Sequence, residues 1–176
     1  MRVASLLVIP AVVVAGSWSI QAGQATDRPA VYTAEQAEAG RRELQTNSFG
    51  NCSDCHTRTL AGRNGNPDEL PSFSSLPENY QKLIAGNSGK VPDLVGAMFR
   101  QRWANRTTKD LIAEFQLRFA PPAAHLSEET RLNMIAYILQ ANGAPPGTQP
   151  LTTATDVAIR TLTSNDAPSI APAEGS

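Results

Sequence analysis

Cysteine, histidine and aromatic side chains are scarce in this 176-residue chain. There are two cysteines and two histidines, so any thiol chemistry depends on one pair of residues. Aromatic residues make up 6% of the sequence, whereas glycine and proline together number 25. The core must therefore form from few large side chains between many loops. A buried apolar cofactor would relieve that shortage.

Long hydrophobic runs are lacking beyond the first residues. Met1-Arg2 precedes an apolar run over residues 4–16 and then small residues that include Gly23-Gln24-Ala25. The run is shorter than the roughly 20 residues that a comfortable membrane span needs. A basic start, an apolar region and a cleavage zone are typical of a secretory signal peptide, so we expect residues 1–25 to be removed on export. An uncleaved N-terminal anchor is the alternative; after cleavage we expect no stable membrane span.

An excess of charge of one sign is lacking too. Removal of Arg2 with the signal peptide leaves 14 basic and 16 acidic side chains. The sequence contains no basic block of the kind that binds a phosphate backbone. We therefore expect no binding to nucleic acid.

Helical patterns recur after residue 32, and no strand pattern competes with them. The capping box Thr33-Ala34-Glu35-Gln36 predicts a helix to about residue 45. Further helices are expected over 78–85, from about 96 to 104, from 107 or 108 to about 120, and from 127 to about 141. Residues 57–77 are rich in turn formers and are expected to form a loop. Periodicity is lost after Pro145, so residues 148–176 are expected to be a flexible tail.

Both cysteines lie in one short motif, Cys52-Ser53-Asp54-Cys55-His56, which the pattern places between the first helix and a loop. A plain disulfide would suit an exported protein but does not account for the adjacent histidine. A thioredoxin-like pair needs a strand before the motif and a helix after it. A zinc site would have to recruit the distant His125. Covalent attachment of a c-type haem explains the whole motif, because the two thiols add across the vinyl groups and the histidine binds the iron.

The flanking sequence resembles a known family. The stretches AEQAEAGRRELQTNSFGNCSDCH, VPDLVGAMFRQRW and LSEETRLNMIAYILQANGAPPG are similar to class I bacterial cytochrome c domains, especially exported monohaem ones associated with quinoprotein dehydrogenases. The resemblance covers about residues 34–147. It implies an all-α cytochrome c fold, with about four to five helices and long loops around one covalent haem c, over residues 26–147. It also implies that the first and last helices cross, with Gly40 and Leu44 meeting Tyr137 and its neighbours.

The resemblance further implies two contacts around the haem. The backbone carbonyl of Pro92 would hold the imidazole of His56, an orienting contact that metal-bound histidines usually have. The equal alternative is that Pro92 is a simple turn residue before a helix. Trp103 matches a position near a haem propionate, and a place in the core is its alternative role.

The sixth iron ligand is where the sequence departs from the family. Cytochromes of this kind usually supply a methionine before the final helix, and Ala120 stands at that position. His125 follows in the same loop, and we rank its ligation equal to an open or water-bound site. Met98 ranks behind both, because Met98 and Met134 are each expected to pack in the core.

The expected function is electron transfer rather than catalysis, because the sequence offers no separate set of acid, base and nucleophile. We expect a periplasmic carrier whose partner is a periplasmic redox protein or a dehydrogenase. One alternative is a haem protein with an open iron site that binds a diatomic gas or reacts with peroxide. Another is a haem-bearing subunit of an exported dehydrogenase complex, with the tail as a linker.

Overall fold

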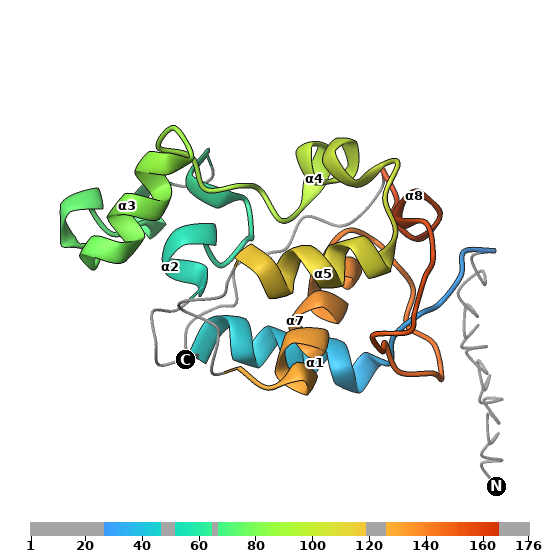
Figure 1. The fold of residues 1–176 in the computed structure, drawn as a ribbon. Helices are drawn as coiled ribbons and strands as arrows, with labels where there is room; N and C mark the ends of the chain where they lie inside the picture. The colour runs from blue at the N-terminus through green and yellow to red at the C-terminus, as the bar shows by residue number, and fades with distance from the viewer. Residues whose placement is uncertain (1–26, 47–51, 65–66, 119–125, 166–176) are drawn as a thin grey trace, which may run out of the picture.

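The structure is a computed structural model that describes residues 27–46, 52–64, 67–118 and 126–165. Its α-helices are α1 (Ala34–Thr46), α2 (Cys52–His56), α3 (Glu78–Gly86), α4 (Gly96–Trp103), α5 (Thr108–Arg118), α7 (Glu128–Ala141) and α8 (Ile159–Leu162). Its 3-10 turns are η1 (Gly62–Asn64), η2 (Pro67–Glu69) and η3 (Phe73–Ser75). The described part of the chain is thus all-helical, as predicted (Figure 1). No helix within it is long and apolar enough to cross a membrane.

The polar residues expected to begin helices do so. Thr33 Oγ1 accepts a hydrogen bond from the Gln36 amide at 3.2 Å, and Gln36 Oε1 accepts one from the Thr33 amide at 3.4 Å. This reciprocal pair is the predicted capping box of α1. Ser127 caps α7 by accepting from the Thr130 amide at 3.0 Å. Gly143, with φ of 82°, follows α7 in the left-handed conformation that ends many helices.

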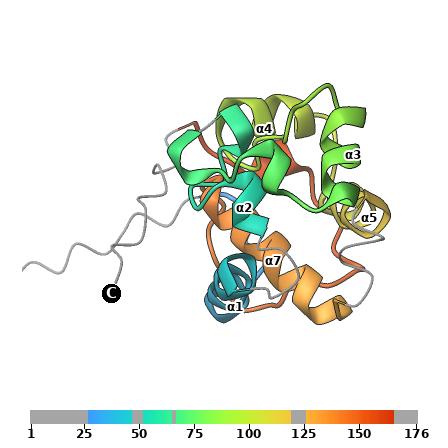
Figure 2. The ribbon, with the colours of Figure 1, turned by 90° about the vertical axis from the view of Figure 1, so that its left-hand side faces the viewer.

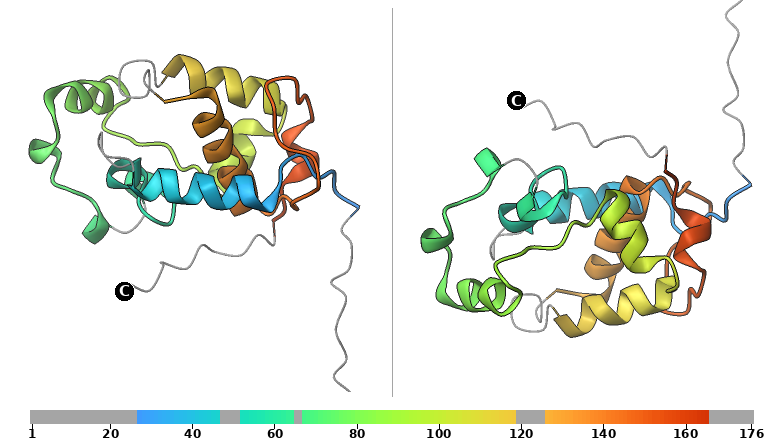
Figure 3. Two further views of the ribbon diagram at one scale, coloured as in Figure 1. Left: turned by 90° about the horizontal axis from the view of Figure 1, so that it is seen from below. Right: turned by 90° about the horizontal axis from the view of Figure 1, so that it is seen from above.

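Helices α1 and α7 form the most extensive helix pair of the described residues (Figure 3). Their closest approach depends on Gly40. A Cβ atom at this position would lie 1.8 Å from the carbonyl oxygen of Asn133 and 2.8 Å from the amide nitrogen of Met134. The two helices therefore meet as expected, but the tightest contact is one helical turn before Tyr137.

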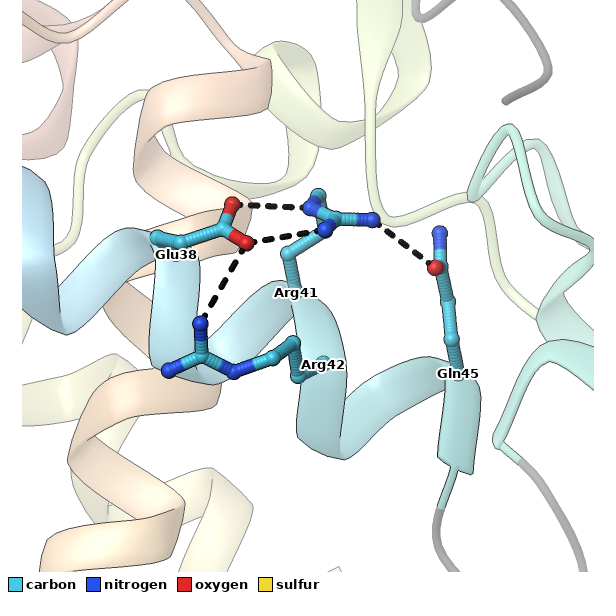
Figure 4. A network of polar contacts seen from close by, with 4 residues as sticks. All are labelled: Glu38, Arg41, Arg42 and Gln45. Carbon is cyan, nitrogen blue, oxygen red and sulfur yellow. Dashed lines mark hydrogen bonds and ion pairs between the residues drawn. The ribbon is translucent and has the colours of Figure 1, made fainter. Parts of the chain in front are cut away.

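The outer face of α1 carries a small polar network (Figure 4). Arg41 donates two hydrogen bonds of 2.8 Å to the carboxylate of Glu38 and one of 3.0 Å to Oε1 of Gln45. Arg42 reaches the same carboxylate at 3.5 Å. These side chains are exposed or partly exposed, so such pairs contribute only a few tenths of a kcal/mol each. The burial of the opposite face of α1 contributes far more.

Two hydrophobic clusters fill the interior. The main core joins α1, α4, α5, α7 and α8, and its fully buried large side chains are Tyr32, Leu44, Leu60, Phe99, Met134, Ile135, Ile138, Leu139, Leu151, Ile159 and Leu162. The second cluster consists of Leu76, Ile84 and Val91. Ile84 belongs to α3, and α3 lies at the opposite end of the molecule from α8 (Figure 1). The region predicted to be a plain loop before α3 thus contributes one buried residue, Leu76, to this small second cluster.

The prediction of a flexible tail is wrong for residues 148–165. Leu151, Ile159 and Leu162 are fully buried in the main core. The hydroxyl of Thr108 donates to the carbonyl of Thr155 at 2.8 Å and accepts from the amide of residue 157 at 3.0 Å. Ile159 and Leu162 are buried on one side of the short helix α8, and Leu151 stands apart from them, so the segment is too short in regular structure to show a period in the sequence. Residues 166–176 lie outside the described residues.

Candidate functional site

The cysteine motif itself forms helix α2, instead of marking a junction between a helix and a loop. Figure 2, which looks onto this end of the molecule, shows α2 between α1 and α3. Both thiols are free and half-buried. Cys52 packs against the main core, and Cys55 packs against the second cluster. The two thiols therefore lie where the two hydrophobic clusters meet.

The imidazole of His56 is held by the residue that the resemblance indicated. Its Nδ1 lies 2.9 Å from the carbonyl oxygen of Pro92. A carbonyl can only accept, so Nδ1 carries the proton and Nε2 keeps its lone pair. His56 is 8% exposed, and burial lowers its pKa to about 4, opposed by the hydrogen bond to Pro92. At neutral pH the ring is therefore neutral, which is the form that binds metals.

A strained turn after His56 brings Pro92 into place. Thr57 and Leu60 have φ values of 63° and 61°, which non-glycine residues rarely adopt. The turn folds the chain back so that the Leu60 carbonyl accepts from the Leu94 amide at 2.8 Å. Gly62 then passes so close to residues 91–93 that a Cβ atom there would lie 2.4 Å from the Val91 carbonyl oxygen. Residues 57–62 and 91–96 are thus packed backbone against backbone beside the histidine.

Both thiols are protonated at neutral pH. Burial raises the pKa of Cys52 to about 11. Burial also raises the pKa of Cys55, while the nearby charge of Arg63 lowers it. Tyr80 packs against the same hydrophobic cluster as Cys55, and burial raises its pKa. A thiol in an apolar place is a poor nucleophile, so this pair is unlike the reactive cysteines of redox enzymes.

Two buried polar atoms near the motif have no hydrogen-bond partner within the described residues. They are Nη1 of Arg63 and Oδ1 of Asp93. The other terminal nitrogen of Arg63 donates to the Pro71 carbonyl at 3.4 Å, and burial raises the pKa of Asp93. Buried polar atoms are nearly always satisfied. Both atoms are therefore available to a water molecule or a bound group.

The donor set fits a haem better than it fits a zinc ion. Within residues 27–46, 52–64, 67–118 and 126–165, no three His, Cys, Asp or Glu side chains come together as a group that could hold a metal ion. A structural zinc ion needs four such ligands. Haem iron requires only the imidazole of His56 from this set, because the porphyrin supplies the equatorial nitrogens. Free thiols and a neutral, oriented imidazole are the groups that such an attachment uses.

Trp103 lies in the main core near the end of α4. Its ring centroid is 6.1 Å from that of Phe99, and the guanidinium carbon of Arg106 lies 4.6 Å from the Trp103 ring centroid. The second contact has the geometry of a cation–π interaction. The core role considered for Trp103 is thus what the structure shows, and a role beside a haem propionate stays a prediction.

The candidates for a sixth iron ligand lie in different surroundings. Met134 is 2% exposed and belongs to the main core, as expected. Met98 is 62% exposed, so the prediction that it packs in the core is wrong. The inward face of α4 is occupied instead by Phe99, which is buried. His125, Ala120 and the expected signal peptide lie outside the described residues.

The comparisons with known proteins add no relative. No protein-family model, no curated protein and no solved structure matches the chain. The site therefore has to be interpreted from its own residues.

Sequence reasoning missed three neighbours of the motif. Arg63 and Tyr80 belong to the segment between His56 and Val91 and lie near Cys55, and Asp93 directly follows Pro92. Gly62 was the available signal, because a glycine six residues after the histidine in a turn-rich segment indicates a close backbone approach. Which segment approaches it depends on the tertiary fold.

Proposed function

We propose that the chain is an exported c-type cytochrome that carries one haem and transfers electrons between periplasmic partners. One observation supports this above all. The chain places a neutral, buried imidazole directly after two free thiols, and a backbone carbonyl 2.9 Å from Nδ1 orients that imidazole. A disulfide would leave the oriented imidazole without a role, and the described residues contain no group of ligands for a zinc ion.

The two cysteines would fix the cofactor covalently. Each thiol would add across one vinyl group, with its sulfur bonding to one vinyl carbon and its proton going to the other. Cys52 and Cys55 face different hydrophobic clusters, so the attached group would be anchored where these clusters meet. Their free state suits this reaction, because a disulfide would first have to be reduced.

His56 would hold the iron through Nε2. Donation from Nδ1 to Pro92 strengthens the basicity of the opposite nitrogen and stops the ring from turning. When bound, haem supplies an iron that takes up and releases one electron. The apolar side chains around the motif, including Leu76 and Ile84, would exclude water and so influence the reduction potential.

Export and partners follow from the sequence. The expected signal peptide would deliver the chain to the periplasm, where a redox protein or a dehydrogenase would exchange electrons with it. A weakly negative mature chain gives little electrostatic steering, so docking would depend on local contacts.

The test begins with the full chain, produced in a bacterium that attaches haem to exported proteins. We expect periplasmic protein whose haem resists extraction by acid and organic solvent, and mostly apoprotein for Cys52→Ala and Cys55→Ala. Asp54→Ala changes an exposed residue of the same motif and is the matched control, with haem retained. Haem that extracts freely from the unmodified protein, or holoprotein found in the cytoplasm, would contradict the proposal.

Electron transfer is tested on the same preparation. A carrier should titrate as a single reversible one-electron couple. Rapid binding of carbon monoxide by the reduced, unmodified protein would indicate an open site and favour the gas-binding alternative. Binding that appears only in His125→Ala would assign the sixth ligand to His125.

A further inference from the structure

Hydrogen bonds hold the segment that orients His56 on both sides of Pro92. Before it, the Val91 carbonyl accepts from the Arg63 amide at 3.4 Å. After it, the Leu94 amide donates to the Leu60 carbonyl at 2.8 Å. These two bonds join backbone to backbone, so no side-chain substitution removes them directly.

Two further bonds to this segment come from one side chain. Nδ2 of Asn142 donates to the Leu94 carbonyl at 2.9 Å, and Oδ1 of Asn142 accepts from the Gly96 amide at 3.0 Å. The side-chain amide of Asn142 thus bonds to the backbone on both sides of Val95, as the backbone of a neighbouring β-strand would. Because one bond lies on each side of Val95, the pair fixes both the position and the rotation of the segment.

Asn142 is itself rigidly held. It is fully buried directly after α7, and Nδ2 also donates to the Ile138 carbonyl at 2.8 Å. Its backbone carbonyl accepts from the Ser164 amide at 2.9 Å. Both Nδ2 donors are used, and Oδ1 has its partner. The end of α7 and residues 94–96 therefore move as one unit.

We propose that Asn142 is a positioning residue for the imidazole of His56. By fixing residues 94–96, it holds the Pro92 carbonyl two residues earlier at the distance and angle that Nδ1 needs. Only the backbone dihedral angles of Asp93 and Leu94 lie between the Pro92 carbonyl and the Leu94 carbonyl that Asn142 holds, which leaves little slack between them. The inference rests on the proposed function only where it takes this imidazole to be an iron ligand.

Loss of the Asn142 hydrogen bonds should therefore weaken the hydrogen bond between His56 and Pro92. Partners that orient a metal-bound histidine change affinity or activity about 10–100-fold when removed. Asn142→Asp keeps the shape of the side chain and the acceptor for Gly96, but it removes the donors to Leu94 and Ile138. Gly143→Ala is the matched control. Alanine is strained at the φ of 82° that Gly143 adopts, so the substitution perturbs the same helix end, but it leaves the side-chain amide of Asn142 unchanged.

The readout is the Nδ1 proton of His56, observed by nitrogen-edited NMR of the labelled full chain, together with its exchange with solvent. At equal overall stability, we expect exchange at least about 10-fold faster in Asn142→Asp than in Gly143→Ala. Equal exchange in the two variants would overturn the proposal.

Two further results keep the test decisive. If Asn142→Asp does not fold, Asn142→Gln keeps an amide one methylene longer, and native protection of the Nδ1 proton in that variant would overturn the proposal. If the purified chain carries no haem but protection still depends on Asn142, the proposed function fails and the positioning role stands. If haem is attached and exchange of the Nδ1 proton does not depend on Asn142, the positioning role is wrong and the proposed function stands.

Discussion

Substitution of Gly40 by alanine should destabilise the fold at the α1–α7 crossing. Alanine favours a helix over glycine by about 1 kcal/mol, so an exposed helix would gain stability. At Gly40 the added Cβ would lie 1.8 Å from the carbonyl oxygen of Asn133, and backbone cannot move aside as a flexible side chain can. Overpacking of this kind costs about 1–3 kcal/mol and sometimes more. Because an approach of 1.8 Å is far inside contact distance, we take the upper end of this range, and after the gain in helix propensity we expect a net loss of about 2 kcal/mol.

The loss is measurable by thermal or denaturant unfolding. A change of 2 kcal/mol corresponds to a fall in Tm of roughly 4–8 °C for a chain of this length. Gly86→Ala is the matched control, since that glycine also lies in a helix, α3, and a Cβ atom there meets nothing within 4 Å. The control should be neutral or slightly stabilising. Equal Tm values for the two variants would refute the assignment of Gly40 to a tight helix crossing.

Three other experiments test the site and the packing around it. Gly62→Ala should cost about 1–3 kcal/mol more than Gly89→Ala in denaturant unfolding, since both have positive φ but only the former would bring a Cβ atom within 2.4 Å of a backbone carbonyl. In haem-free chain, the raised pKa of Cys52 should slow its alkylation at pH 8 about 100-fold relative to an unperturbed thiol, as mass spectrometry would show; alkylation at the rate of a free thiol would contradict its burial. Removal of residues 148–176 should cost about 4 kcal/mol or more through its buried aliphatic side chains, whereas removal of 166–176 alone serves as the control; equal unfolding midpoints would count against this packing.

The helices were predictable because their ends carry local signals. Thr33 and Ser127 cap their helices through bonds that span three residues, so the sequence alone contains both partners. The C-terminal segment carries no such signal. Leu151 and Ile159 are buried by contacts with distant helices, and nothing in the intervening residues shows that such partners exist.

The site, too, has a part that the sequence predicts and a part that depends on the tertiary fold. The spacing of Cys52, Cys55 and His56 is local, and so the sequence predicts their common chemistry. Asn142 lies 50 residues from Pro92, and the sequence assigned its region only to the end of a helix. Its role depends on where α7 ends relative to residues 94–96, which is decided by the packing of the whole core.

Covalent attachment of one haem can be measured from the intact mass of the exported, fully denatured protein. We expect the mass of the mature chain plus that of one haem. We also expect a peptide containing both Cys52 and Cys55 to carry the added mass. A denatured chain with no added mass, obtained from cells that attach haem to a known cytochrome produced in parallel, would contradict haem attachment.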